Sequence, residues 1–374
     1  MEKLFIGFTS TNIQSIIMIF VGLLLVYLAI KKEYEPLLLL PIGFGTILVN
    51  LPLSVVLDYE GTPGFLKILF DAGIATELFP ILIFIAVGAM CDFTPMFTQP
   101  LMMFFGAAAQ FGIFATIIFA TILGFDFKVA SAIGIIGAAD GPTAIYVAAK
   151  FAKSYLGPIS VAAYSYMSLV PLIQPIVIKS MTTKEERRIR MKKGGKNVPK
   201  SLKILFPIMV TLISGFIAPM SVPLIGALML GNLLRESGVV EKLSKSAQNE
   251  LAAVTTLLLG IAIGSTMQAE KFLTFDTIKI LLLGLFAFVF DTIGGILFAK
   301  FLNLFLKDKI NPMVGAAGIS AFPMSARVVH KLAQDDDPNN YILMEAVSAN
   351  LSGQIGSVIA GGLVLAFVPI LLGL

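Results

Sequence analysis

Gly137-Ala138-Ala139-Asp140-Gly141-Pro142-Thr143 interrupts a run, residues 129–149, that otherwise reads as a membrane segment. A carboxylate deep in a bilayer costs roughly 2.5–3.5 kcal/mol on insertion scales, so Asp140 is expected to have a function. The Gly141-Pro142 pair breaks a helix and frees backbone carbonyl groups. A fixed negative charge beside free carbonyls is the chemistry of a small-cation site. The sequence therefore predicts a broken or re-entrant helix with such a site at the break.

The composition around this stretch is that of a membrane protein. Of 374 residues, 57% are hydrophobic and 13% are charged, whereas soluble domains are about 45–50% apolar and about 25% charged. The single cysteine, Cys91, excludes an internal disulfide and a cysteine metal site, and the single histidine, His330, argues against a histidine-rich centre. The net charge of +4 is concentrated in one loop and does not indicate nucleic-acid binding. We predict an all-α polytopic membrane protein.

Apolar runs of about 20 residues mark helical spans. We place them near residues 11–30, 37–56, 77–91, 101–123, 159–178, 202–220, 251–265 and 278–300. Further runs are interrupted or of unusual length: 129–149 breaks at Gly141-Pro142, 223–234 ends in Gly231-Asn232, 311–332 breaks around 318–323, and 341–374 is too long for one straight helix. Short or Gly/Pro-interrupted segments in matching places are typical of a transporter site at the midplane.

One strongly basic loop, residues 179–200, separates a first membrane half, 1–178, from a second, 201–374. It carries nine basic residues against Glu185 and Glu186, so its net charge is +7. The positive-inside rule places it in the cytoplasm. The loop could be only a topology determinant, or it could be a docking surface for an acidic soluble partner. Lys31 and Lys32 are also expected on the cytoplasmic side. If residues 129–149 crossed the membrane fully, the loop with these two lysines would face outside. If the segment dips in and returns, both basic loops face the cytoplasm, so the charge rule favours a re-entrant or broken segment around Asp140.

Two stretches on either side of this loop resemble each other. The first begins at Gly137 and the second at Gly315, and both run Gly-Ala-Ala, then Pro, then Val and Lys at equal offsets from the proline, with a longer spacing before Pro323 than before Pro142. This pattern is expected of two inverted-topology repeats whose broken or re-entrant helices meet near the midplane. Gly-Ala-rich membrane sequence also produces such similarity by chance.

The two stretches supply oxygen ligands, which a hard cation such as Na⁺ prefers. The candidates are Asp140 and Thr143 in the first stretch and Asn311, Ser320 and Ser325 in the second, with Gly315 and Gly318 permitting close backbone approach. Local roles are the alternatives. Asn311-Pro312 could be an ordinary helix start, and Ser and Thr in membrane helices often bond to the backbone four residues back.

Three further polar side chains lie within apolar runs. Arg327 needs an anion there, which could be Asp140 in an ion pair or a substrate carboxylate held by the planar guanidinium. Asp291 is a second buried carboxylate, either a proton or cation ligand or the acceptor of a structural hydrogen bond. Tyr166 could be an interfacial anchor, or a phenol that donates or relays a proton near Asp140. No Walker loop, dinucleotide fingerprint or nucleophile triad occurs, so ATP is not the expected energy source.

Three long motifs resemble the beta subunit of the sodium-pumping, biotin-dependent decarboxylases, whose members act on oxaloacetate, methylmalonyl-CoA, glutaconyl-CoA and malonate. They are the stretch 137–143, Gly231-Asn-Leu-Leu-Arg-Glu-Ser-Gly238, and the stretch 311–327. The likeness covers most of the chain. It implies a subunit of the bacterial inner membrane that decarboxylates carboxybiotin carried on a partner, consumes a proton and drives Na⁺ outward.

The resemblance also implies site residues and partners. It implies functional roles for Asp140, Tyr166, Asn311, Gly315, Ser320 and Arg327, with Arg327 as the carboxybiotin contact. Together with the chemistry of the residues, this predicts Na⁺ binding by Asp140, Asn311, Ser320, Gly315 and Thr143, and carboxybiotin binding by Arg327 and Ser325. Catalysis is predicted for Asp140, Arg327 and Tyr166, with Asp291 as a possible secondary site residue. Na⁺ and biotin are the implied cofactors, the biotin being attached to a partner and not to this chain. The implied partners are a carboxyltransferase (alpha) subunit, a biotin-carrier subunit and a small single-span membrane subunit, around a homotrimer of this chain.

Two details leave alternatives open. The tail Met344–Asn350 departs from the form that the resemblance associates with oxaloacetate enzymes, which favours an acyl-CoA decarboxylase complex. An inverted repeat with Asp140 and Arg327 would serve a secondary Na⁺/carboxylate symporter equally well. A non-catalytic membrane anchor for a soluble enzyme is a third possibility.

Overall fold

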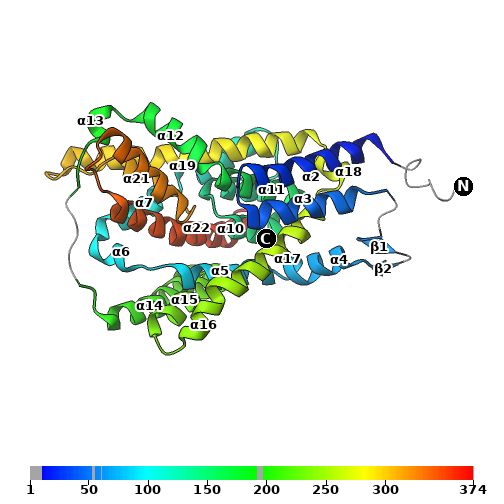
Figure 1. The fold of residues 1–374 in the computed structure, drawn as a ribbon, viewed down its shortest axis with the longest axis horizontal. Coiled ribbons are helices and arrows are strands. Elements are labelled where there is room, and N and C mark those ends of the chain that lie inside the picture. Colours follow the sequence, from blue (N-terminus) through cyan, green and yellow to red (C-terminus); the bar gives the residue numbers. More distant parts are fainter. Residues whose placement is uncertain (1–10, 53–54, 60, 192–196, 374) are drawn as a thin grey trace, which may run out of the picture.

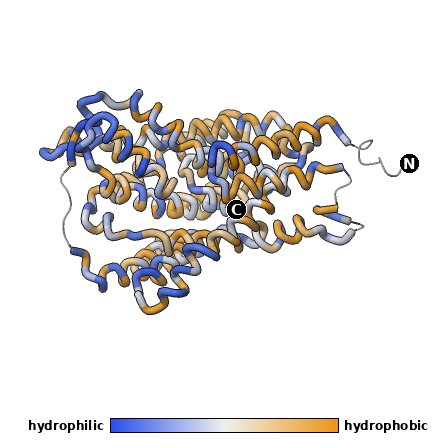
Figure 2. Tube along the Cα trace, viewed as in Figure 1, coloured by the Kyte–Doolittle hydropathy of each residue, from blue (hydrophilic) through white to orange (hydrophobic). Residues whose placement is uncertain are grey.

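Helices build nearly all of the part of the chain that the structure describes, a computed structural model covering residues 11–52, 55–59, 61–191 and 197–373 (Figure 1). Its only strands, β1 (Asp58–Tyr59) and β2 (Thr62–Pro63), form a two-stranded antiparallel pair. Six helical stretches in this part are long and apolar enough to cross a membrane, or up to eight if each of two bent pairs is one span. Apolar residues dominate these stretches in Figure 2. The predicted all-α polytopic membrane protein is confirmed.

The elements of the first half follow one another as antiparallel helices and broken segments. They are α2 (Ile13–Lys31), α3 (Pro36–Asn50), α4 (Phe65–Leu69), a π-helical turn at 70–75, α5 (Leu78–Met90), α6 (Thr94–Thr98), α7 (Met103–Ala108), α8 (Phe111–Ile122), α9 (Phe127–Gly134), α10 (Gly141–Phe151), α11 (Leu156–Ser168) and α12 (Val170–Met181). The short helix α13 (Lys184–Arg187) lies in the basic loop. Lys192, Lys193 and Lys196 of that loop lie outside the described residues.

The second half has a similar order of elements. They are α14 (Lys200–Ile217), α15 (Val222–Ser237), α16 (Glu241–Ser246), a π-helical turn at 247–251, α17 (Ala252–Gly264), α18 (Ala269–Phe272), α19 (Phe275–Phe305), α20 (Met313–Ala316), α21 (Met324–Asp336) and α22 (Leu343–Leu371). In each half, two long helices precede a helix that is interrupted by a π-helical turn, and a broken segment follows later.

The two halves cross each other through glycine contacts. Helix α5 packs against α15, and α17 packs against α3. A Cβ atom on Gly88 would lie 1.8 Å from the carbonyl oxygen of Leu228, and one on Gly264 would lie 2.5 Å from that of Ile42. Because lipid supplies no hydrophobic driving force between helices, such close backbone contacts are how membrane helices associate. The crossings therefore fix the two halves to one another.

Three predicted segments differ from the structure. The expected span 159–178 is bent by 68° between α11 and α12, where Pro171 lies in the first turn of α12. The short run 223–234, predicted to end at Gly231-Asn232, is longer than expected, because α15 continues to Ser237 and the Asn232 amide bonds to the Cys91 carbonyl at 2.9 Å. The run 341–374 contains one unbroken helix, α22. Glycine and amide residues in these two helices serve packing and hydrogen bonding instead of interruption.

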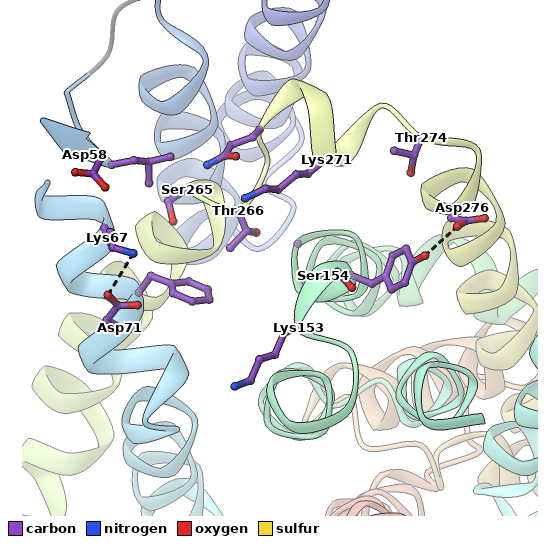
Figure 3. A pocket seen from close by; sticks show the side chains of 15 residues that line it. Asp58, Lys67, Asp71, Lys153, Ser154, Ser265, Thr266, Lys271, Thr274 and Asp276 are labelled. Carbon is purple, nitrogen blue, oxygen red and sulfur yellow. Dashed lines mark hydrogen bonds and ion pairs between the residues drawn. The ribbon is translucent and has the colours of Figure 1, made fainter. Parts of the chain in front are cut away.

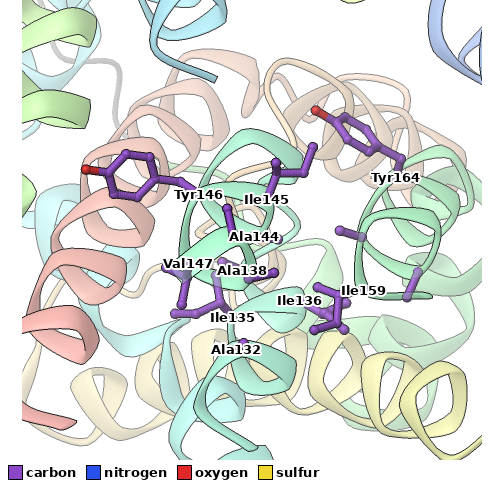
Figure 4. Packing of buried hydrophobic residues seen from close by; sticks show 14 of the residues in the cluster. Ala132, Ile135, Ile136, Ala138, Ala144, Ile145, Tyr146, Val147, Ile159 and Tyr164 are labelled. Atoms are coloured by element: carbon purple, nitrogen blue, oxygen red, sulfur yellow. The ribbon is translucent and has the colours of Figure 1, made fainter. Parts of the chain in front are cut away.

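Helices α9 and α10 form a re-entrant hairpin, termed the first hairpin. The start of α9 and the end of α10 lie side by side, since the rings of Phe125, just before α9, and Tyr155, just after α10, are 6.0 Å apart. Its tip is the turn at Ala139-Asp140, which separates the two arms. Buried residues such as Ile136 and Ile145 pack the arms into the core (Figure 4). The structure thus has the segment that dips in and returns, as the parity of the spans favoured.

A second hairpin, α20 and α21, enters from the other end of the molecule. Helix α19 has 31 residues and is about 45 Å long, so its two ends mark opposite ends of the molecule. Near its start, Asp276 accepts a hydrogen bond from Tyr155 at the base of the first hairpin, at 2.9 Å. Near its end, the Asn303 amide bonds to Ile310 at the base of the second hairpin, at 2.7 Å. The tips meet between these bases, where the Ser320 N–H donates to the Ala138 carbonyl at 2.9 Å.

Candidate functional site

Asp140 is placed at the tip of the first hairpin by a left-handed turn. Ala139, at φ 53°, ends the preceding 3₁₀ turn, and Asp140 then becomes the N-cap of α10. Its carboxylate accepts the Thr143 hydroxyl at 2.7 Å and the Thr143 N–H at 3.4 Å. Asp residues are favoured as N-caps because the side chain accepts an otherwise unpaired helix N–H. The sequence thus places a buried carboxylate at the point where the helix starts.

Helix α22 completes the surroundings of this carboxylate. Ser357 donates its hydroxyl to Asp140 Oδ2 at 2.7 Å, and the Gln354 amide lies 3.3 Å from the same oxygen. The Ser320 hydroxyl, from the tip of the second hairpin, is 3.1 Å from the Ser357 hydroxyl. Asp140, Thr143, Ser320 and Ser357 are all buried. We call these four residues the oxygen cluster.

The oxygen cluster has the donor set of a hard-cation site. One carboxylate and three hydroxyl groups suit Na⁺, which binds oxygen ligands. No group of three or more His, Cys, Asp or Glu side chains that could hold a metal occurs in the described part of the chain. Asn350 lies on the same side of α22, and its amide N–H₂ bonds to the Ile319 carbonyl at 2.6 Å. Its buried Oδ1 has no hydrogen-bond partner among the described residues.

Asn311 does not reach the oxygen cluster. It lies at the base of the second hairpin, where its amide donates to the carbonyl oxygens of Arg187 at 2.8 Å and Ile189 at 3.0 Å. Its Oδ1 accepts the Met313 N–H at 3.1 Å, as in an ordinary helix start. The structure therefore does not bring Asn311 together with Asp140, because the eight residues 312–319 of the hairpin arm lie between Asn311 and Ser320.

Ser325 and Gly315 pack within the second hairpin and its neighbours. The Ser325 hydroxyl is buried and hydrogen-bonded to the Gln174 amide group of α12 at 2.7 and 3.0 Å. Gly315 faces Gly295 of α19, and a Cβ atom on it would lie 2.0 Å from the Gly295 carbonyl oxygen. The Ser325 hydroxyl is therefore used in a buried contact between α21 and α12, and Gly315 allows two backbones to touch.

Arg327 is exposed on α21, seven residues beyond Ser320. It forms no ion pair with Asp140, whose carboxylate is instead surrounded by hydroxyl and amide donors. In the described part of the chain no salt bridge involves Arg327. Of the two interpretations of Arg327, the structure does not show the ion pair.

The tyrosines of α11 have different surroundings. The Tyr166 hydroxyl donates to the Leu281 carbonyl of α19, away from Asp140. The ring of Tyr164 lies against Gly141, where a Cβ atom would approach it to 2.2 Å. The buried Tyr164 hydroxyl has no hydrogen-bond partner in the described residues. Tyr164, and not Tyr166, is thus the phenol that packs beside the Asp140 turn.

Asp291 caps a helix from the side. Its Oδ1 accepts the N–H groups of Gly112 at 2.5 Å and Ile113 at 3.2 Å, in the first turn of α8. A negative charge is favourable at a helix N-terminus, so this contact is the structural hydrogen bond that the sequence left open. Its Oδ2 is buried beside Gly137 and has no hydrogen-bond partner among the described residues.

Sequence reasoning missed Ser357 and Gln354 as members of the site. A signal for them exists, because Asn350, Gln354 and Ser357 are spaced four and three residues apart and so share one face of α22. Polar residues on one face of a long apolar helix point toward the protein interior. Read as a stripe, they would have identified α22 as the third wall of the site.

Two cavities lie at opposite ends of the molecule. One, of about 350 Å³, lies beside α21 and is lined by residues of α6, α21 and the start of α22, among them Gln99, His330, Tyr341 and Glu345. The other, of about 760 Å³, lies at the base of the first hairpin. Figure 3 shows the Lys67–Asp71 pair on one of its walls and Asp276, the acceptor of the Tyr155 hydroxyl, on the other.

Comparison with known proteins covers nearly the whole chain. The family model described as the Na⁺-transporting oxaloacetate decarboxylase beta subunit matches residues 14–368. The chain is 50% identical to the glutaconyl-CoA decarboxylase subunit beta of Acidaminococcus fermentans, over 97% of this chain and 95% of that protein. It is 50% identical to the methylmalonyl-CoA decarboxylase subunit beta of Veillonella parvula, over 97% and 94%. It is 43% identical to the oxaloacetate decarboxylase beta chain 2 of Salmonella typhi, over 94% of each.

Proposed function

Because this chain belongs to the family of Na⁺-transporting oxaloacetate decarboxylase beta subunits, we propose that it decarboxylates carboxybiotin and couples this reaction to Na⁺ export. It would work in the bacterial inner membrane, with the basic loop in the cytoplasm. Its partners would be a carboxyltransferase subunit, a biotin-carrier subunit and a small single-span subunit, around a homotrimer of this chain. We further propose that its two halves are inverted repeats.

The meeting of the two hairpin tips is the observation that carries the proposal. A buried carboxylate and three hydroxyls converge there from α10, α22 and the turn before α21. The two hairpins enter from opposite ends of the molecule. One hairpin therefore connects each end with the oxygen cluster. Irregular backbone at membrane depth is tolerated where protein surrounds it, and it is typical of ion sites in transporters. This arrangement supports Na⁺ as the cargo held at Asp140.

The cytoplasmic end offers a place for the carboxylated head group. Arg327 has an exposed guanidinium without a salt bridge in the described residues, and His330, one turn along α21, lines the cavity of about 350 Å³. Residues three apart on a helix lie on one face. The buried Nδ1 of His330 has no hydrogen-bond partner among the described residues. Arg327 would hold the carboxylate by two parallel hydrogen bonds, and the cavity would receive the ring.

The residues of the chain would couple these two sites through charge. When bound, biotin supplies a nitrogen that carries the carboxylate and becomes basic once CO₂ has left. Arg327 orients that carboxylate and loses its anion when CO₂ leaves. A proton that reaches Asp140 removes the negative charge of the oxygen cluster and so weakens its hold on Na⁺. Moving one charge against 100 mV costs about 2.3 kcal/mol, which decarboxylation can supply. The cavity at the base of the first hairpin is the proposed route outward.

The acid that feeds the complex is not chosen by this chain. The two acyl-CoA relatives named above are 50% identical to it and the Salmonella oxaloacetate chain is 43% identical. Together with the tail at Met344–Asn350, this favours an acyl-CoA decarboxylase complex. Family membership argues against the symporter and the passive anchor, since the relatives bear the names of decarboxylase subunits.

Decarboxylation of free carboxybiotin by the purified subunit tests the proposal. Wild-type protein should be stimulated by Na⁺, and Asp140→Asn should lose both turnover and the stimulation. Asp126→Asn is the matched control, because Asp126 is the exposed N-cap of the other arm of the same hairpin and lies outside the oxygen cluster. Undiminished turnover of Asp140→Asn with a normal Na⁺ response would contradict the scheme.

A further inference from the structure

We propose that the segment 183–190 is a strap that holds the base of the second hairpin, and that Asn311 is a positioning residue for this strap and not a Na⁺ ligand. The inference rests on the proposed function only where its test measures Na⁺-dependent decarboxylation. It concerns the end of the hairpin opposite to the tip that carries Ser320.

Two asparagine amides bind the same pair of strap carbonyls. Asn311 precedes the inward arm of the hairpin, and Asn340 follows the outward arm. The Asn311 amide lies 2.8 and 3.0 Å from the carbonyl oxygens of Arg187 and Ile189. The Asn340 amide lies 3.1 and 3.2 Å from the same two oxygens. Both side chains are buried, at 0% and 1% exposure. The strap therefore joins the two ends of the hairpin through one hydrogen-bonded centre.

Arginine side chains of the strap bind the end of α21. Arg187 Nε donates to Asp336 Oδ2 at 2.5 Å, and its Nη1 donates to the Thr182 carbonyl at 2.7 Å. Arg190 makes a two-point contact with the Asp337 carboxylate, at 2.7 and 3.0 Å. Such paired N–H···O⁻ contacts fix orientation as well as distance. Part of the positive charge of the basic loop is therefore neutralised by the hairpin itself.

The strap also has a fixed start. Thr183 and Glu186 form a reciprocal capping box at the beginning of α13. Lys300, in the last part of α19, pairs with Glu186 at 3.0 Å. Helix α19 contacts the base of the first hairpin at its other end. The strap thus ties the second hairpin to the helix that runs past both hairpins.

This geometry gives Asn311 a role without cation contact. Both polar atoms of its amide are used locally, Nδ2 by the strap and Oδ1 by the Met313 N–H. Loss of Asn311 frees one end of the hairpin base, which shifts the Ser320 tip and weakens Na⁺ binding indirectly. Asn340 lies at the other end of the base and makes the same strap contacts. If Asn311 acts through the strap, loss of the Asn340 side chain must weaken Na⁺ binding as loss of Asn311 does.

Substitutions at the two asparagines separate the strap from a ligand role. We expect Asn340→Ala to raise the Na⁺ concentration for half-maximal decarboxylation as Asn311→Ala does, each by about tenfold. Asn311→Asp should be equally defective, because a carboxylate cannot donate to the two carbonyls. Asn339→Ala is the matched control, since Asn339 is the exposed neighbour and contacts Asp337 through its backbone N–H, which the substitution keeps. A normal Na⁺ response in Asn340→Ala, or in Asn311→Asp, would overturn the proposal.

Cysteine labelling gives a readout that needs no activity. The only native cysteine, Cys91, is fully buried. A cysteine introduced by the substitution Ile189→Cys should react with a water-soluble maleimide about tenfold faster in Asn311→Ala and Asn340→Ala than in Asn339→Ala, because release of the strap is a local opening. Equal labelling rates would overturn the proposal. If wild-type protein showed no Na⁺-stimulated decarboxylation, the proposed function would fail while labelling still tested the strap.

A charge-reversal pair tests the strap away from the two buried asparagines. Arg190→Asp and Asp337→Arg should each speed the labelling of the thiol introduced at position 189 and raise the Na⁺ requirement, and the double variant should restore both. Arg190 is exposed and Asp337 is partly exposed, and neither side chain belongs to the buried core. Normal single variants would contradict a strap held by this pair, and so would defective single variants that the double variant fails to restore.

Discussion

The backbone N–H of Ser320 donates to the carbonyl oxygen of Ala138 at 2.9 Å, and this bond joins the tips of two hairpins from the two halves of the chain. The bond brings the hydroxyl of Ser320 to the side chains around Asp140 by way of Ser357, which lies 3.1 Å from Ser320 and 2.7 Å from Asp140. The Ser357 hydroxyl thus bridges the side chains of the two tips, beside the backbone bond.

Removal of the Ser357 hydroxyl should weaken Na⁺ binding. Hydrogen bonds to charged groups contribute about 1.5–3 kcal/mol, so Ser357→Ala should raise the Na⁺ concentration for half-maximal activity by about one to two orders of magnitude. Ser348→Ala is the matched control, because Ser348 is buried on the same helix and its hydroxyl has no hydrogen-bond partner among the described residues. Equal Na⁺ responses of the two variants would remove Ser357 from the site.

The glycine pair Gly295 and Gly315 should tolerate no methyl group. A Cβ atom on either glycine would lie 2.0 Å from the carbonyl oxygen of the other, and overpacking costs about 1–3 kcal/mol or more. Gly295→Ala and Gly315→Ala should therefore both lower the thermal midpoint in detergent and impair activity. Gly226→Ala should do neither, since its nearest neighbour would be 3.9 Å away. A defect confined to Gly315→Ala would instead indicate a ligand role.

Replacement of Arg327 should change substrate binding and not stability. Arg327→Lys keeps the charge but loses the planar pair of donors, so the KM for carboxybiotin should rise at least about tenfold with the thermal midpoint unchanged. Lys331→Ala, one turn further along the exposed side of α21, should behave as wild type. Wild-type KM in Arg327→Lys would argue against the proposed carboxylate contact.

Closure of the strap should not depend on pH near neutrality. The hydrogen bond from Arg190 lowers the pKa of Asp337 below its ordinary value. A carboxyl with a lowered pKa stabilises the folded contact above its ordinary pKa and loses it as the pH falls through the lowered value. Labelling of the Ile189→Cys variant should thus be constant between about pH 5 and pH 8, after correction for the reagent, and should rise only in stronger acid. A rise between about pH 6 and pH 7 would point to a different group.

The sequence by itself determined the membrane class and the break at Asp140. These features follow from local physics, because a 20-residue apolar run spans a bilayer and Gly-Pro cannot continue a helix. A buried charge beside such a break marks a site wherever the rest of the chain lies.

Only the tertiary structure decided which residues gather around that charge. Ser357 joined the oxygen cluster and Asn311 did not, although both are small polar residues in apolar runs. The sequence does not determine the depth to which each hairpin arm reaches or the face that α22 presents. Those depend on packing between elements far apart in the chain, such as the contact of Gly295 with Gly315. Hydrogen bonds reach only about 3 Å, so membership in the site is settled by that packing.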